Sequence, residues 1–256
     1  MDIEDKGFFS FFLHYCDLAV KRGWHPGAGG CLSMMIFPEL ILGIEAGLDF
    51  TGKFEPIPFQ VPELSKEFLA VSSRSRFMDD MLARPDEFCG IIQIAPDGTG
   101  YRKVLGFEGG TEPSEDLPVH LLIHAKRFGK SGDRKSVVYH CHPAKLTALS
   151  YLLPLEDRAF SEAILRASFQ CRKLLPEGVG VVKASEVDLG DLAEKTAKKM
   201  ERFDAAVWAF HGLICTADCL PNVILITEVL ERAAEMRILL MQMPGGVRQE
   251  PELELP

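Results

Sequence analysis

The chain has 256 residues, a formal net charge of −9 and a pI of about 5.3. Apolar residues make up 47% of the sequence and charged residues 25%, which is typical of a globular protein long enough to bury a sizeable core. The acidic balance disfavours nucleic acids and anionic membrane surfaces as partners, because both repel a negatively charged protein.

The seven cysteines show no paired spacing, so we expect reduced thiols. The N-terminal stretch lacks the basic region, apolar core and small-residue cleavage site of a secretory signal, and no apolar run is long enough to cross a membrane. Together these features predict a cytoplasmic protein.

The first half of the chain predicts a helix followed by short strands. Aromatic residues at helical spacing in residues 3–22, stopped by Gly23, predict an amphipathic helix. A turn that contains Gly29 and Gly30 leads into a strand over 31–37; it can offer backbone N–H groups to an anion, or it can be a tight turn and nothing more. The pattern further predicts loops over 38–66 that leave room for a short strand or a helical turn, a strand over 68–73, a short helix over 75–82 and a β-hairpin over 90–94 and 101–105.

Hydroxyl and guanidinium groups alternate at the end of the strand over 68–73. Ser73, Arg74 and Ser75, followed by Arg76, form this Ser-Arg-Ser-Arg turn. Side chains of these types bind phosphate or carboxylate through charge-assisted hydrogen bonds, so they are candidate substrate contacts. The alternative is a solvated turn without a ligand.

The second half predicts alternating helices and strands. Ser114 is a candidate N-cap for a helix that runs to about Phe128 and ends at Gly129, with acidic residues in its first turn. The later elements are a strand over 136–142, helices over 144–153 and 156–169, a strand over 179–183, a helix over 189–203, strands over 205–211 and 213–216, a helix over 222–243 opened by Pro221, and a loose tail over 248–256. Together they predict one three-layer α/β/α domain over residues 1–256, with a mixed, largely antiparallel central sheet.

Two of the predicted strands end in histidines. His140 and His142 lie two residues apart, so their side chains share one face of a strand, while Cys141 between them turns to the other face. His211 follows a second apolar run, and Gly212 beyond it permits a sharp turn or a close approach of the backbone. A lone histidine in such a place is more often a packing residue. Three neutral imidazoles that meet, without a fourth protein ligand, would leave an open position on Zn²⁺, as in catalytic zinc sites.

Several segments, in the same order, resemble the class II aldolase/adducin family, and the resemblance covers most of the chain. The specific parts are Val138-Tyr139-His140-Cys141-His142 and Trp208-Ala209-Phe210-His211-Gly212; the others are Lys21-Arg22-Gly23-Trp24 with Gly29-Gly30, Ser114-Glu115-Asp116-Leu117-Pro118-Val119-His120, and Leu175-Pro176-Glu177-Gly178-Val179-Gly180. The resemblance implies a homotetramer and a zinc-dependent lyase. Its expected reaction is the retro-aldol cleavage of a ketose 1-phosphate to dihydroxyacetone phosphate and lactaldehyde.

The resemblance also implies roles for individual residues. Zinc would be bound by His140, His142 and His211 and would stabilise the enediolate that is left when the C3–C4 bond breaks. A carboxylate at the start of the preceding helix would move the proton; this is Asp116 in an ungapped match, or Glu115 if the match slips by one residue. The phosphate would be held by the glycine-rich turn and by hydroxyl groups such as that of Ser114.

The chain departs from the family pattern on the substrate side. Ala28 and Cys31 stand where the family usually has phosphate-binding asparagines, and Glu115 stands where a phosphate-binding serine is expected. Gln170, which cannot titrate, replaces a second acidic residue. Three other functions therefore stay open: a zinc aldolase or epimerase for a different sugar, phosphorylated or not; a catalytically silent adducin-like interaction domain; and a zinc hydrolase.

Overall fold

A sheet runs through the computed structural model, which describes residues 7–74, 84–132, 136–184 and 188–243. Its strand order is β2-β5-β4-β3-β1-β6-β9-β8-β7. The strands are β1 (Cys31–Met35), β2 (Glu55–Pro56), β3 (Phe68–Ser72), β4 (Cys89–Ile94), β5 (Gly100–Gly106), β6 (Val137–Cys141), β7 (Gly180–Val182), β8 (Ala205–Trp208) and β9 (Gly212–Ala217). Of these described strands, β7 and β8 pair in parallel and the other neighbours are antiparallel, which confirms a mixed, largely antiparallel sheet.

Nine α-helices lie in the described part of the chain. They are α1 (Gly7–Lys21), α2 (Pro38–Ile44), α3 (Pro85–Phe88), α4 (Leu117–Ser131), α5 (Ala144–Leu149), α6 (Asp157–Ala167), α7 (Phe169–Leu174), α8 (Leu189–Lys199) and α9 (Leu220–Gln242), with short 3₁₀ turns at η2 (Pro26–Ala28), η3 (Glu45–Gly47), η4 (Pro62–Leu64) and η6 (Glu108–Gly110). No described helix combines the length and the apolar character needed to cross a bilayer.

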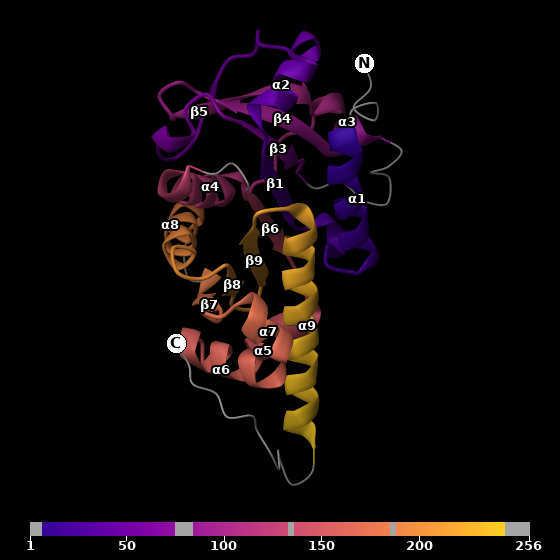
Figure 1. The fold of residues 1–256 in the computed structure, drawn as a ribbon, viewed down its shortest axis with the longest axis vertical. Coiled ribbons are helices and arrows are strands. Elements are labelled where there is room, and N and C mark those ends of the chain that lie inside the picture. Colours follow the sequence, from indigo (N-terminus) through magenta and orange to yellow (C-terminus); the bar gives the residue numbers. More distant parts are fainter. Residues whose placement is uncertain (1–6, 75–83, 133–135, 185–187, 244–256) are drawn as a thin grey trace.

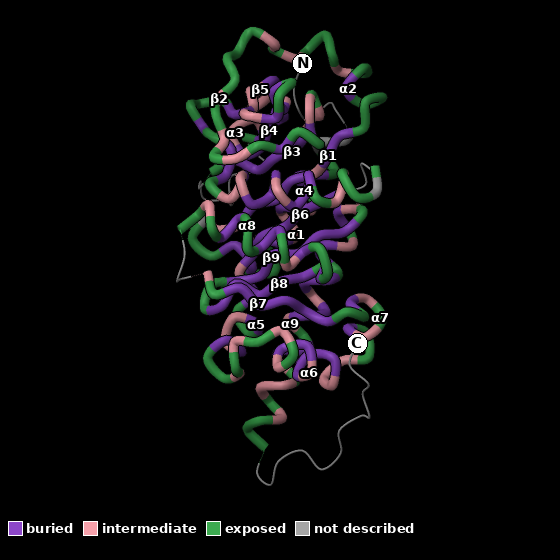
Figure 2. Tube along the Cα trace, turned by 90° about the vertical axis from the view of Figure 1, so that its left-hand side faces the viewer, coloured by how far each residue is buried: buried purple, intermediate pink, exposed green. Residues whose placement is uncertain are grey.

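Helices cover both faces of the sheet, which confirms the predicted α/β/α layers. In Figure 1, α4 and α8 lie on one side of the strands, and α1 and α9 lie on the other. The alternation along β6 shows why: Tyr139 and Cys141 pack into the apolar cluster beneath α1 and α9, whereas Val138 packs with α4 and α8. Figure 2 shows the strands as the buried middle of the molecule. His140 has the same parity as Val138 and therefore faces α4.

The start of α4 differs from the prediction. The helix begins at Leu117, with Asp116 as its N-cap residue. It ends before Gly132, which takes the left-handed conformation, and not at Gly129 as predicted. The Asp116 carboxylate does not cap the helix, because it bonds to a histidine ring, and Ser114 Oγ accepts the Asp116 N–H at 3.3 Å. The predictions of Ser114 as N-cap and of acids in the first turn are therefore wrong.

Other boundaries also move. α2 forms in the region predicted as loops, where Pro38 provides the fixed φ of a first helical turn. The helix predicted over 156–169 breaks at Ser168, whose hydroxyl accepts the Cys171 N–H and begins α7. β8 ends at Trp208, three residues earlier than predicted, and a tight turn follows. The predicted helix over 75–82 and the tail over 248–256 lie outside the described residues.

Candidate active site

The three predicted metal ligands come together on the α4 side of the sheet. His140 is on β6, His142 is the first residue after β6, and His211 is in the turn between β8 and β9. Each offers one ring nitrogen, and these three nitrogens lie within 4.8 Å of one another. The pairing of β6 with β9, with Cys141 opposite Leu213, brings the two chain segments side by side. The arrangement therefore follows from strand register, which fixes both ends of the cluster at once.

Two glycines make room for the His142 ring. A Cβ added to Gly212 would collide with the carbonyl oxygen of Cys141 and would lie 3.2 Å from His142 Cδ2. A Cβ added to Gly29 would lie 2.8 Å from His142 Cε1. The close approach predicted at Gly212 is what the structure shows, and Gly29 of the glycine-rich turn packs against a predicted metal ligand.

The cluster fits a divalent cation. His140 Nε2 is buried and has no hydrogen-bond partner among the described residues. The Nε2 atoms of His142 and His211 are 3.4 Å apart, which is long for a hydrogen bond between them. Two nitrogens at zinc–nitrogen distances of 2.0–2.1 Å and a tetrahedral angle would be separated by about 3.4 Å. The donor set of three imidazoles suits zinc and leaves a coordination position for another ligand.

Asp116 fixes the orientation of the His140 ring. Its Oδ2 accepts a hydrogen bond from His140 Nδ1 at 2.7 Å. Burial alone would raise the pKa of Asp116, but the hydrogen bond and the charge of His140 outweigh burial and lower that pKa to about 2. An ionised carboxylate can only accept, so the hydrogen must be on Nδ1. A metal at His140 would therefore bind Nε2, the ring nitrogen that does not face Asp116.

The rings of His142 and His211 are held neutral near pH 7, because the protein lowers the pKa of each. Burial, followed by the nearby His140 and His211, lowers the pKa of His142 to about 3. Burial and the nearby His140 also lower the pKa of His211. In the unfolded chain these rings take up protons near their ordinary pKa of about 6.5, so acid favours the unfolded chain as the pH falls below that value. At neutral pH these two rings present lone pairs and carry no positive charge.

Glu115 lies apart from the cluster, although it is adjacent to Asp116 in sequence. Its carboxylate forms an ion pair with Arg74, and both side chains are more than half exposed. This pair joins one of the two candidate proton carriers to a candidate phosphate contact. The structure therefore divides the two acids between two places: Asp116 is at the histidines, and Glu115 is at the Ser-Arg-Ser-Arg turn.

The remaining candidate substrate contacts are spread around the cluster. Ser73 is buried and donates its hydroxyl to the Glu87 carbonyl oxygen at 2.8 Å, while Ser75 lies outside the described residues. Gly30 has a φ of 102°, and a Cβ added to it would lie 2.7 Å from the ring of His25. Cys31 is fully buried, and burial raises the pKa of its thiol to about 12. Neither Ser73 nor Cys31 is free to contact a ligand in this arrangement.

The turn that carries His211 contains a feature that sequence reasoning missed. Phe210 has a φ of 64°, a conformation that a bulky residue rarely adopts. Its ring packs against that of Tyr151, with the centroids 4.7 Å apart. The His211 N–H donates to the Trp208 carbonyl oxygen at 3.0 Å and closes the turn. Strain of this kind gathers at functional sites, where the surrounding structure must hold it; no sequence signal marks a phenylalanine for this conformation.

Trp208 is a second residue that the sequence reasoning did not assign. Its ring centroid lies 4.4 Å from that of His140, and its indole N–H donates to Thr196 Oγ1 on α8 at 3.0 Å. The alternation of β8 could have found it, because Trp208 has the same parity as Ala206, which packs on the α4 and α8 side. The indole walls one side of the histidine cluster.

A family model for the class II aldolase and adducin N-terminal domain matches residues 12–238. The chain belongs to this family. A rhamnulose-1-phosphate aldolase from Pectobacterium atrosepticum is 28% identical over 228 residues, which cover 89% of this chain and 83% of that protein. One from Klebsiella pneumoniae is 25% identical over 247 residues, which cover 96% of this chain and 89% of that protein.

The solved structures agree on the fold of this class II aldolase. A sugar-phosphate aldolase from Thermotoga maritima matches with a TM-score of 0.76 at 20% identity, covering 95% of this chain and all of that one. The resemblance predicted from the histidine motifs is confirmed, and the chain belongs with the aldolases of the family, which are metal-dependent carbon–carbon lyases.

Proposed function

We propose that this class II aldolase uses zinc to cleave a ketose 1-phosphate of the rhamnulose 1-phosphate type to dihydroxyacetone phosphate and lactaldehyde, as a step of rhamnose catabolism. The observation that carries the proposal is the buried His140 Nε2, which lacks a described partner beside two further imidazoles. The names of the curated relatives support the substrate class. An adducin-like silent domain would have no need of three histidines whose ring nitrogens lie within reach of one ion.

His140, His142 and His211 would hold the zinc through one ring nitrogen each. Bound zinc supplies positive charge at the substrate oxygen on which negative charge develops as the C3–C4 bond breaks. The His140–Asp116 hydrogen bond keeps the ring in one orientation, and Gly29 and Trp208 confine the rings of His142 and His140. The chain thus presents its ligands in a fixed arrangement before any substrate arrives.

Asp116 is the residue that we assign to proton transfer. Its Oδ2 is engaged with His140, and no described residue donates to Oδ1. Oδ1 would take the proton from the substrate C4 hydroxyl as the C3–C4 bond breaks and would return it to C3. Glu115 is the weaker candidate, because its carboxylate faces Arg74 at the surface. The partial burial of Asp116 supports the same choice, since a base that is largely shielded from water stays in one position.

Arg74 is the residue that we assign to the phosphate, with Ser114 and the backbone around Gly29 and Gly30 beside it. A guanidinium binds phosphate through paired hydrogen bonds. In the absence of substrate, Glu115 occupies Arg74, so the phosphate would have to displace a carboxylate that repels it. This competition is the specific reason to keep a second candidate function, in which the same zinc chemistry acts on an unphosphorylated sugar.

An assay for lactaldehyde, run beside a coupled assay for dihydroxyacetone phosphate, separates the two candidates, because cleavage of unphosphorylated rhamnulose releases lactaldehyde and dihydroxyacetone without a phosphate. Zinc-loaded protein is given rhamnulose 1-phosphate, a second ketose 1-phosphate and unphosphorylated rhamnulose, with His142→Ala as the inactive control. We expect turnover of rhamnulose 1-phosphate and none by the variant. Zinc-loaded protein that turns over no phosphorylated ketose would reject the first candidate. Sedimentation equilibrium tests the homotetramer that we predict from family membership.

A further inference from the structure

A buried row of polar side chains lies behind Asp116, between α4 and the sheet. Asp116, His120 and His124 follow one another at four-residue spacing at the start of and along α4, so their side chains share one face of the helix. His120 and His124 are 0% exposed. What we call the polar column consists of His120, His124, Ser33 of β1 and Ser136 next to β6. The metal hypothesis uses none of these four side chains.

Three hydrogen bonds join the polar column from end to end. Ser136 Oγ lies 2.8 Å from His124 Nδ1, and His124 Nε2 lies 2.8 Å from Ser33 Oγ. Ser33 Oγ in turn lies 2.7 Å from His120 Nδ1. His120 Nε2 is the nitrogen at the end of the column; it is buried and has no hydrogen-bond partner among the described residues.

Counting hydrogens leaves two arrangements for the whole column. Burial lowers the pKa of His120 to about 3 and that of His124 well below its ordinary value, so each neutral ring carries one N–H. Ser33 has a single hydroxyl hydrogen and contacts two ring nitrogens. If it accepted from both, its own hydrogen would have no acceptor among the described residues, so we infer that it donates to one and accepts from the other. The direction of one hydrogen bond therefore sets the direction of all three.

The two arrangements differ in what they leave unpaired. In the first, Ser136 donates to His124, His124 donates to Ser33, and Ser33 donates to His120 Nδ1, so that His120 carries its hydrogen on Nε2. In the reverse arrangement the Ser136 hydroxyl hydrogen needs an acceptor, and no described residue supplies one. That arrangement also buries a bare His120 Nε2 lone pair, so two groups stay unpaired where the first arrangement leaves one.

The neighbourhood of His120 favours the first arrangement again. Asp116 stands one helical turn away, and its negative charge raises the pKa of His120 against the effect of burial, so the two groups are close enough to attract. An N–H dipole is stable beside a partly buried carboxylate, whereas a lone pair there is repelled.

We propose that His120 is a positioning residue for Asp116, held by the polar column as a neutral ring with its hydrogen on Nε2. The N–H steadies the charge and the orientation of the carboxylate that also holds His140. Its effect on catalysis rests on the proposed function, whereas the tautomer does not.

The tautomer is read directly by long-range ¹H–¹⁵N correlation spectra of zinc-loaded protein labelled with ¹⁵N-histidine, with the His120 signals assigned through His120→Gln. We expect Nε2–H for His120, a mixture or Nδ1–H in Ser33→Ala, and no change in Thr216→Val. The control removes a buried hydroxyl of the same sheet that donates to Val137 and lies outside the column. Nδ1–H in the wild-type protein, or unmixed Nε2–H in Ser33→Ala, would overturn the inference.

Two substitutions of His120 test its effect on Asp116. A glutamine amide can place an N–H near the position of Nε2, whereas an asparagine amide reaches only the position of Nδ1. We expect kcat within about threefold of wild type for His120→Gln and a loss of about tenfold or more for His120→Asn, at similar KM. Equal losses would overturn the positioning role. A confirmed tautomer in a protein without lyase activity would count against the proposed function and leave the column intact.

Discussion

The two halves of the site are built differently. The histidines stand on β6 and on the β8–β9 turn, in the middle of the sheet, where register and burial fix them. The candidate phosphate contacts, Arg74 and Glu115, stand on exposed segments that follow β3 and precede α4. The metal half keeps the family motif, whereas the substrate half departs from it at Ala28, Cys31 and Glu115. In this chain strand pairing fixes the histidine cluster, whereas the candidate phosphate contacts lie on turns that can change without unfolding the sheet.

The largest effect should follow from damage to the metal half. His142→Ala removes one of three ligands, and we expect zinc content to fall from about one equivalent to below about a tenth, and kcat/KM to fall by on the order of 10³-fold. Metal analysis and the coupled assay on the same preparation measure both. His14→Ala is the matched control, since His14 is an exposed histidine on α1. Retained zinc and an unchanged rate in His142→Ala would show that the ion is not held here.

The two neighbouring acids should separate the halves most clearly. Asp116→Asn keeps the size of the side chain and removes its charge, and we expect a loss of about 10²–10⁴-fold in kcat at saturating zinc. Glu115→Gln should change kcat by less than about threefold, because its partner is the surface residue Arg74. A larger loss of kcat in Glu115→Gln than in Asp116→Asn would identify Glu115 as the proton carrier.

Gly29 tests whether the glycine-rich turn belongs to the metal half as well. Gly29→Ala places a Cβ 2.8 Å from His142 Cε1, with no backbone strain at its φ of −76°. We expect zinc affinity to weaken by about tenfold, by displacement of the ring. Gly43→Ala in α2 is the control, since nothing lies within 4 Å of its added Cβ. Equal zinc affinity in the two variants would mean that the glycine-rich turn does not help to hold His142 for the metal.

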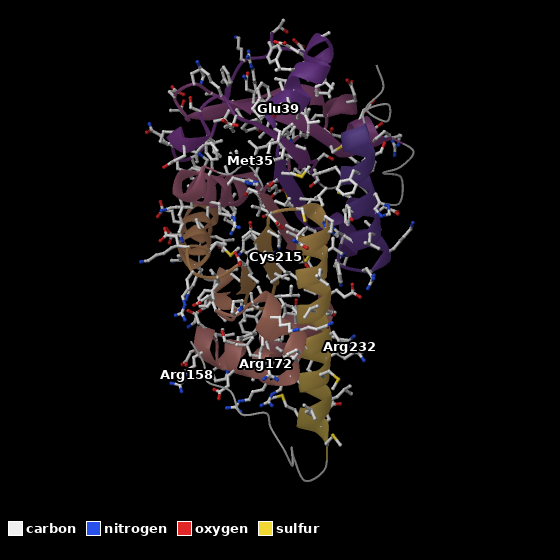
Figure 3. The ribbon with its side chains drawn as sticks, viewed as in Figure 1. Met35, Glu39, Arg158, Arg172, Cys215 and Arg232 are labelled. Atoms are coloured by element: carbon white, nitrogen blue, oxygen red, sulfur yellow. The ribbon has the colours of Figure 1, made fainter. Side chains whose placement is uncertain are left out.

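The smallest effect should come from the substrate half. Arg74→Ala removes an exposed guanidinium, and we expect KM for a ketose 1-phosphate to rise about fivefold with little change in kcat. Arg232→Ala, on α9 toward the other end of the molecule (Figure 3), is a matched exposed arginine that also pairs with a glutamate. An equal KM for the ketose 1-phosphate in the Arg74→Ala and Arg232→Ala variants would mean that Arg74 does not bind the phosphate.

Much of the fold and the metal cluster could be predicted because the signals are local. The alternation through Val138, His140 and His142 and the Pro143 that ends the strand are visible in the sequence, and they gave both the strand and the shared face of the histidines. Pairing of β6 with β9 then brought in His211. The predicted mixed sheet followed from the Asp97-Gly98-Thr99-Gly100 hairpin in the same way.

The features that could not be predicted depend on contacts between distant segments. Asp116 is a poor N-cap to its own helix because His140, on a strand that follows the helix, takes its carboxylate. The hydroxyl of Ser33 on β1 bonds two histidines of α4, a pairing that no spacing reveals. The positive φ of Phe210 is held by packing against Tyr151, far along the chain, and not by the residue's own preference.

The most direct test of the account is X-ray absorption spectroscopy of the protein loaded with one equivalent of zinc. We predict a first shell of three histidine nitrogens at about 2.0–2.1 Å and at least one oxygen from water, with that oxygen replaced when a ketose 1-phosphate analogue is added. A shell that contains cysteine sulfur, or one filled by protein ligands that does not change with the analogue, would contradict the claim that His140, His142 and His211 hold a catalytic metal.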